Sequence, residues 1–216
     1  MNRVGISRMA LEDLWSMNQV FVALMQSHAA ARPGSGAGHF GLAPGLMARL
    51  ARLDAAERAG IGRCPFALCS FGFQDLELWQ RLLGRKVSEP ANREHWPGQA
   101  SPGRQFTVMA LGLVRSLAAR EPHAADLFFG LPADFGAAFA DFDLAQLPRL
   151  AGQAEVHLRA RLGDHPRFWS ELLAAASSGS AARCRAIRDL GLQLTLQRAL
   201  RIEGAKPRCG VLCRAF

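Results

Sequence analysis

Two pairs of cysteines come nearest, among the reactive residues of this sequence, to a chemical motif. Cys64 and Cys69 are separated by four residues, and Cys209 and Cys213 by three. Zinc sites use paired thiolates at short spacing, so these four side chains could bind one zinc ion. The gaps are longer than the typical two residues, and buried or unreactive thiols are the alternative. Because the five cysteines are odd in number and scattered over 216 residues, we expect reduced thiols and predict no metal site.

Other patterns that could indicate catalysis or a cofactor are weaker. Gly36, Gly38 and Gly41 satisfy the GxGxxG spacing of dinucleotide-binding loops. That fingerprint requires a preceding strand, and these glycines follow a Pro- and Ser-containing loop instead. The histidines fall at expected helix ends and loops, where surface or capping roles are the ordinary interpretation. No nucleophile, base or metal constellation is recognisable, so we predict neither an enzyme nor a cofactor.

Arginine is the residue type that most suggests a partner. The net charge is +8, and lysine occurs only at Lys86 and Lys206. A basic surface attracts nucleic acid over long range, although the high Ala, Gly and Arg content could also reflect a G+C-rich genome. The charges are spread along the chain and could equally form a solvated face. The arginines that we predict as DNA contacts lie in expected helix pairs, at Arg49, Arg52, Arg58, Arg63 and Arg149.

The elements that would position these residues are helical in the first half of the chain. Apolar spacing predicts a helix over 9–31 and another carrying Leu46 and Leu50. Asp54 and Glu57 have the spacing of a capping box, which predicts a third, short helix. Residues 66–73 alternate around Cys69, Phe71 and Phe73, which favours an extended segment before a helix around Trp79.

A polar stretch rich in Pro and Gly, 85–104, predicts a linker between a first unit at 1–84 and a second at 105–203. In the second unit we predict a helix over 106–119 and a last helix over 181–202, followed by a basic tail at 204–216. The residues expected on the buried side of the last helix are Cys184, Ile187, Leu190, Leu194 and Leu200.

The two units share the order of their signals at an offset of 89 residues. Phe129-Gly130-Leu131 repeats Phe40-Gly41-Leu42, and the spacing of Asp54 and Glu57 returns at Asp143 and Gln146. Together these matches predict an internal duplication, although two helical segments can share the same start signals without common origin. In each unit a helix pair, over 43–60 and 132–152, has the order of a helix-turn-helix, or is simply a packing unit.

No apolar run approaches the roughly 20 residues that span a bilayer, and the N-terminus lacks the apolar region of a secretory signal. We therefore expect a cytoplasmic protein with no membrane partner.

These motifs resemble those of the FlhD family, the smaller subunit of a flagellar transcriptional regulator. Residues 67–75 (ALCSFGFQD) are similar to the family pattern L-V-C-H-F-R-F-D-D and retain its cysteine, both phenylalanines and the second acid. Residues 144–151 (LAQLPRLA) look like the family's L-P-Q-M-x-K-L-A helix. The offset of 89 places Leu158, Ala160 and Leu162 where Cys69, Phe71 and Phe73 stand, and Arg161 alone of that core is retained.

The resemblance implies an all-α fold of two FlhD-like helical repeats, each with a helix-turn-helix-like pair and a short extended segment. It also implies self-association, a larger FlhC-like partner subunit, and double-stranded DNA bound through the complex. A subunit-bridging disulfide in the family would fall at Cys69. Since Leu158 replaces the cysteine in the second unit, no symmetric disulfide can join the two units.

Our leading hypothesis from the sequence is therefore a transcriptional regulator subunit acting on promoter DNA. The alternative is a helical adaptor, such as a chaperone-like accessory protein of a flagellar or secretion system, that binds a partner helix in an apolar groove. The residues predicted for a partner interface are Leu46, Leu50, Cys69, Phe71, Phe73 and Trp79.

Overall fold

The computed structural model describes residues 6–31, 40–84, 101–132 and 135–205. The chain is mostly helical, with one sheet of two short strands, which confirms the expected helical class. The elements of the first half are α1 (Arg8–Ala31), α2 (Pro44–Leu50), α3 (Ala55–Gly62), β1 (Cys69–Ser70) and α4 (Leu76–Gly84). Those of the second half are α5 (Pro102–Arg120), α6 (Pro122–Phe129), α7 (Phe135–Ala140), the 3-10 turn η3 (Leu144–Gln146), α8 (Leu147–Ala154), the 3-10 turn η4 (Glu155–His157), β2 (Arg159–Ala160), α9 (Phe168–Ser177) and α10 (Ala181–Ala205).

Local sequence signals explain several of these boundaries. Asp54 caps α3 by accepting from the Glu57 amide at 2.7 Å, and the Glu57 carboxylate accepts from the Asp54 amide at 2.9 Å, so the predicted capping box is confirmed. In the second half, Asp143 instead caps η3, and α8 starts later, at Leu147. Ser101 caps α5, so residues 102–104 are helical and not part of the predicted linker. Residues 85–100 of that linker lie outside the described residues.

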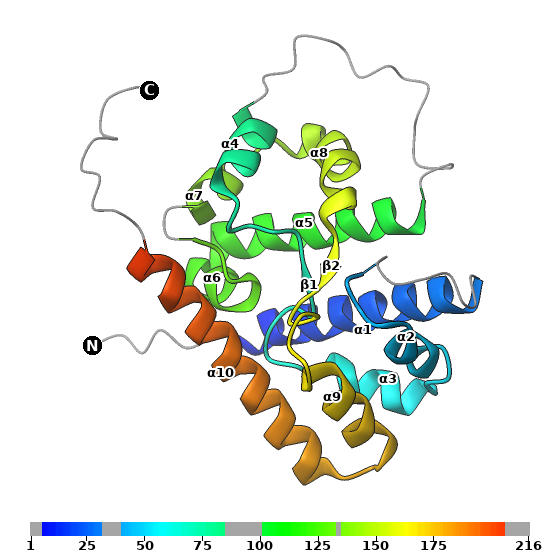
Figure 1. Cartoon of the computed structure of the whole chain (residues 1–216). Helices are drawn as coiled ribbons and strands as arrows, with labels where there is room; N and C mark the ends of the chain where they lie inside the picture. Colours follow the sequence, from blue (N-terminus) through cyan, green and yellow to red (C-terminus); the bar gives the residue numbers. More distant parts are fainter. Residues whose placement is uncertain (1–5, 32–39, 85–100, 133–134, 206–216) are drawn as a thin grey trace.

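Helices α1 and α5 lie side by side at the centre and run in opposite directions (Figure 1). Helices α2, α3, α9 and α10 are on one side of this pair, whereas α4, α7 and α8 are on the other. The buried apolar side chains of both halves form one cluster, so the predicted units at 1–84 and 105–203 do not have separate cores. None of the helices that the structure describes is both long and apolar enough to cross a bilayer.

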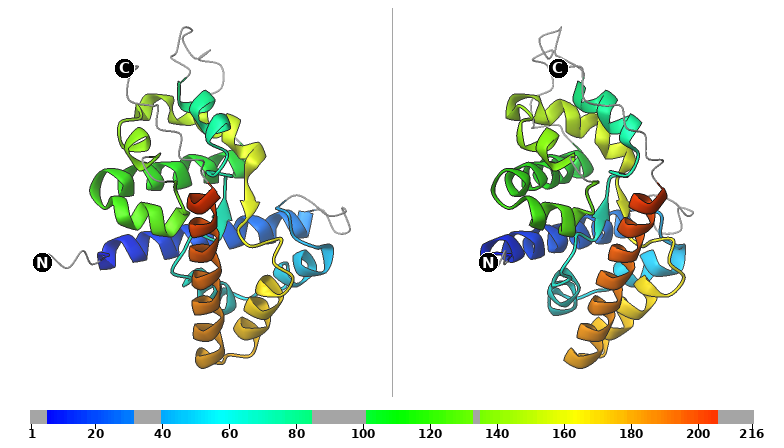
Figure 2. Two further views of the ribbon diagram at one scale, coloured as in Figure 1. Left: turned by 60° about the vertical axis from the view of Figure 1, so that its left-hand side comes forward. Right: turned by 90° about the vertical axis from the view of Figure 1, so that its left-hand side faces the viewer.

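The two halves exchange their last short helices. Trp79 of α4 packs against Phe135 and Phe139 of α7, with ring centroids 6.0 and 5.6 Å apart. In return, α9 of the second half packs against α2 and α3 of the first. Two further views show α4 and α9 at opposite ends of the molecule (Figure 2). Each half therefore completes the core of the other.

Strands β1 and β2 meet at the centre of this arrangement. They are antiparallel, and Cys69 pairs with Ala160 while Ser70 pairs with Arg159. The paired positions are related by 90 residues, so the ladder has the register of a local two-fold axis. Within the predicted extended segment 66–73, only Cys69–Ser70 is a strand.

Backbone geometry around the strands follows nearly the same offset. Gly72 and Leu162, 90 residues apart, both have left-handed backbone with φ of 67° and 59°. Leu162 is unusual in this respect, because a side chain normally disfavours that conformation. The indole of Trp79 donates to the Phe71 carbonyl at 3.3 Å, and that of Trp169 donates to the Arg161 carbonyl at 2.9 Å.

Asn18 of α1 holds the segment that leads into β1. Its side chain is fully buried, and the amide nitrogen lies 3.2, 3.4 and 3.0 Å from the carbonyl oxygens of Gly62, Cys64 and Phe66. The amide oxygen accepts from the Leu68 backbone N–H at 2.9 Å. One side chain thus satisfies backbone groups that a non-helical buried segment would otherwise leave without partners.

Candidate nucleic-acid interface

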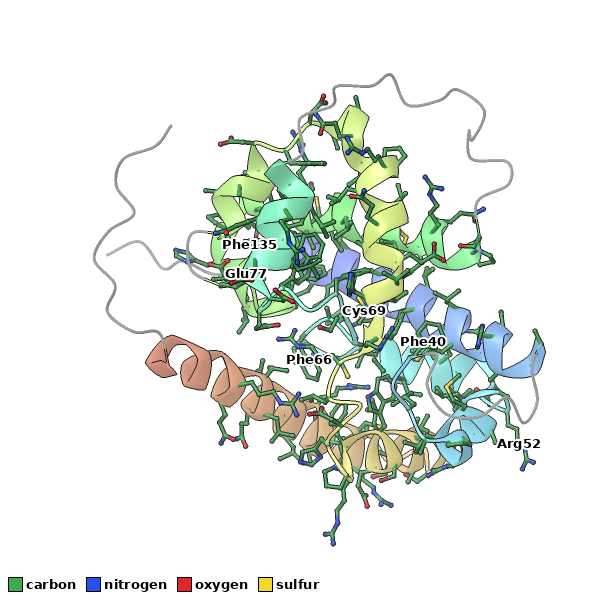
Figure 3. The ribbon with its side chains drawn as sticks, turned by 45° about the horizontal axis from the view of Figure 1, so that its top comes forward. Phe40, Arg52, Phe66, Cys69, Glu77 and Phe135 are labelled. Carbon is green, nitrogen blue, oxygen red and sulfur yellow. The ribbon has the colours of Figure 1, made fainter. Side chains whose placement is uncertain are left out.

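Short helix α3 places two of the predicted arginines at opposite ends of one surface ridge. Arg52 precedes the N-cap of α3 and Arg63 is its C-cap residue, roughly 12 Å away along an eight-residue helix. Both side chains are exposed, and Arg52 projects from the surface in Figure 3. Within the described part of the chain, no carboxylate forms a salt bridge with either. Their guanidinium groups are free to contact phosphate.

The structure adds arginines that the sequence did not indicate. A cleft of about 640 Å³ separates α3 from the start of α10 and is lined by Arg63, Arg185 and Arg188, with Asp54 and Glu57 at its edge. The Arg188 guanidinium donates to the Gly60 carbonyl, which fixes α10 against α3. We call the set Arg52, Arg63, Arg185 and Arg188 the α3–α10 arginines. Their sequence positions are far apart, so only the packing of α10 could reveal the cluster.

The other predicted DNA contacts are not part of this cluster. Arg49 is exposed but donates to the Ser170 carbonyl of α9 at 3.4 Å, and Arg58 is half-buried and donates to Gln26 at 2.8 Å. Both therefore stabilise packing around α2 and α3. Arg149 lies on α8, in a small hollow on the opposite side of the α1–α5 pair. The five predicted arginines do not form one surface.

Arg161, the residue of the family pattern retained in the second half, lies inside the molecule. Its guanidinium donates to the Phe128 carbonyl at 2.6 Å and lies 6.0 Å from the centroid of the Phe66 ring. Burial lowers the pKa of Arg161 to about 10, the nearby Arg198 lowers it further, and proximity to Cys69 acts in the opposite direction. The group is still a cation at neutral pH and serves the core.

The predicted apolar groove is wrong as a surface feature. Leu50, Phe71 and Trp79 have no exposed surface, Phe73 is 1% exposed and Cys69 is 2% exposed. Leu46 is only partly buried and packs against the same core. The physical reason is the exchange of helices, because α7 brings Phe135 and Phe139 onto Phe73 and Trp79 and covers the side that the first half leaves apolar.

The described cysteines are free thiols buried to different degrees. Burial raises the pKa of Cys64 and of Cys69 to about 12, against small opposing effects of Arg188 and Arg161 respectively, whereas Cys184 is half-buried. Cys209 and Cys213 lie outside the described residues. Among the residues that the structure does describe, no three His, Cys, Asp or Glu side chains are grouped so as to bind a metal.

We expect Cys64 and Cys69 to react with iodoacetamide at pH 8 roughly a thousandfold more slowly in the folded protein than in urea, because so few folded molecules carry the thiolate. Mass spectrometry of labelled peptides measures this, with Cys184 as the internal comparison. Unfolded thiols ionise near 9.0 and folded ones near 12, so stability should fall as pH rises through that window. Equal labelling of Cys69 and Cys184 would contradict the burial.

Comparison with known proteins gives no match to a family model, a curated protein or a solved structure.

Proposed function

We propose that the chain is a transcriptional regulator subunit built from two FlhD-like repeats, which binds promoter DNA through the α3–α10 arginines as part of a complex with an FlhC-like partner. The observation that carries the proposal is the exposure of Arg52, Arg63 and Arg185 with no carboxylate partner in the described part of the chain. Exposed arginines on a short helix and beside it provide the backbone contacts that set a protein's position on a duplex.

The tandem relation of the halves is supported by geometry that recurs at nearly one offset. The two-fold register of β1 and β2, and the two indole hydrogen bonds, each recur after 90 residues. Gly41 and Gly130 recur after 89 and share left-handed backbone, with φ of 74° and 64°. A one-residue difference between these offsets corrects our sequence alignment, since Arg159, and not Leu158, then stands at the position of Cys69.

Two repeats in one polypeptide would form a pseudo-dimer in which corresponding surfaces are free to differ. Helix α8 corresponds to α3, and it carries Arg149 where α3 has Arg52 and Arg63 at its ends. The absence of a second α3–α10 cluster among the described residues therefore favours one DNA contact per chain. A helix-turn-helix dimer, by contrast, presents two equivalent recognition helices.

The test is a titration of labelled duplex DNA with the full chain, alone and with an FlhC-like subunit, followed by fluorescence anisotropy at several salt concentrations. Affinity should fall steeply with salt because each neutralised phosphate contributes a slope of about −0.9. Replacing Arg52 or Arg63 by glutamine should each reduce that slope by about 1.

The matched control is Arg8→Gln on α1, because Arg8 is equally exposed but pairs with Glu12 at 2.8 Å and lies away from α3. Its salt slope should equal that of the unaltered chain. If neither the chain nor its mixture with the partner binds DNA at low salt, or if all three variants have the same slope, the proposed function is wrong.

A further inference from the structure

Helix α10 is held against the first half by a close backbone approach. Gly191 is buried, and a Cβ atom built there would lie 2.5 Å from Cζ of Phe66 and 2.6 Å from Cε2 of Phe168. The two rings are 6.0 Å apart between centroids and lie under the helix backbone. Thr195, one turn further along, is 4% exposed. Phe66 is thus the centre of a helix-docking surface whose occupant is already present.

The corresponding place in the other half has no helix on it in the described structure. The offset of 90 residues that relates Trp79 to Trp169 relates Phe66 to Val156. Phe66 has no exposed surface under α10, whereas Val156 is 65% exposed, the largest fraction among the exposed large apolar side chains of the described residues. An apolar side chain at an equivalent position is therefore left in solvent.

A cavity of about 710 Å³ adjoins Val156. It lies between the C-terminal end of α1, the N-terminal end of α5 and η4, and its apolar lining includes Leu24, Phe40, Val156 and Leu158. Polar groups at the edge come from Ser27 and Arg159. The Arg159 guanidinium donates to the carbonyls of Val156 and Leu158 at 3.0 and 2.9 Å, which holds the lining residues in place.

We infer that this cavity, here called the Val156 groove, binds an amphipathic α-helix of a partner protein, with a small residue of that helix seated over Val156. The kind of occupant is indicated by α10, which is the helix found at the equivalent position on Phe66. The chain's own α10 is committed to Phe66 through Gly191, so the second position needs a helix from another molecule. The inference rests on the proposed tandem relation of the halves and is independent of the DNA contact.

A labelled peptide of residues 181–205 serves as the probe, because it has the shape and the central glycine of a helix that fits the equivalent site. Anisotropy titration with the full chain should give saturable binding. Val156→Asp should weaken that binding at least about tenfold, since a carboxylate would be desolvated under the helix. A peptide carrying Gly191→Leu should lose affinity to a similar extent, because its side chain prevents the close approach.

The matched control is Val20→Asp, at a valine of α1 that is 44% exposed and does not line the groove. It should leave peptide affinity unchanged, and both variants should retain the far-ultraviolet circular dichroism of the unaltered chain. Binding that ignores Val156→Asp would mean that the peptide displaces α10 from Phe66, and it would overturn the inference, as would no binding up to about 1 mM peptide.

Dimerisation of the chain, measured by sedimentation, gives the remaining outcome. If the chain dimerises and Val156→Asp abolishes the dimer, the groove belongs to α10 of a second copy and the inference of a partner protein is wrong. Failure of DNA binding leaves the peptide result unchanged, since neither Val156 nor the probe contributes to the salt slope of the α3–α10 arginines.

Discussion

Replacing Asn18 by alanine is expected to lower the free energy of unfolding by at least about 3 kcal/mol, because several buried backbone groups lose their hydrogen-bond partner together. The carbonyls of Gly62, Cys64 and Phe66 lose a donor, and the Leu68 N–H loses its acceptor. Each buried polar group left unsatisfied costs about 1–3 kcal/mol, reduced where water can enter the space that the side chain leaves.

Urea denaturation followed by circular dichroism measures this effect as a lower midpoint at an unchanged slope. Thr107→Ala is the matched control. Thr107 is also fully buried on a long helix, but its hydroxyl donates only to the Gly103 carbonyl of its own helix at 2.8 Å. Its replacement should cost only about 1 kcal/mol. Equal midpoints for the two variants would show that Asn18 does not hold the segment before β1.

Phe73→Ala is the second change with a large expected effect, about 3–5 kcal/mol. The Phe73 ring is 1% exposed and lies within 4.8 Å of the Trp79 ring and 5.8 Å of the Phe139 ring, between centroids. Phe129 and Phe135 approach it from the second half at 6.5 and 6.1 Å. The truncation removes contacts on both sides of the exchanged helices and leaves a cavity that neither half can close.

Thermal and urea unfolding of the variant test this expectation, with Leu144→Ala as the comparison. Leu144 is 55% exposed, and its truncation should change stability by no more than about 0.5 kcal/mol. A loss below about 1 kcal/mol for Phe73→Ala would place the ring at an accessible surface and restore the predicted partner groove.

The sequence predicted helices better than it predicted what covers them. The spacing of apolar residues located α1 and α4 to within a residue, and Asp54 with Glu57 located the start of α3. The same pattern identified the apolar side of Phe73 and Trp79 but not its partner. That side is covered by Phe135 and Phe139, and the contact depends on tertiary packing that no local pattern encodes.

Helix α10 shows a related limit. Its leucines suggested a buried side that included Leu190, yet Leu190 is 39% exposed and the buried positions are Gly191 and Thr195. Apolar periodicity assigns the buried face to the largest apolar side chains, whereas a helix lying directly on the Phe66 ring needs its smallest residue there. Strand β2 was similarly weak in sequence, because Arg159 and Ala160 lack β-branching and pair through the partner strand.

For the candidate site, the sequence identified Arg52 and Arg63 but not Arg185 and Arg188. The last two join the cluster only because Arg188 of α10 donates to the carbonyl of Gly60 in α3. Charge alone could not separate these from Arg58 and Arg161, which are equally basic in sequence and serve packing in the structure.

The exchange of α4 and α9 also constrains how the chain folds as it leaves the ribosome. Trp79 emerges well before Phe135 and Phe139, and α2 and α3 emerge before α9 is made. At ordinary elongation rates the first half waits on the order of ten seconds with its apolar side uncovered, which is the interval in which nascent chains aggregate or recruit chaperones. Translation speed between the codons of Gly84 and Phe168 is therefore expected to affect the soluble yield of the protein, even when the amino-acid sequence is unchanged.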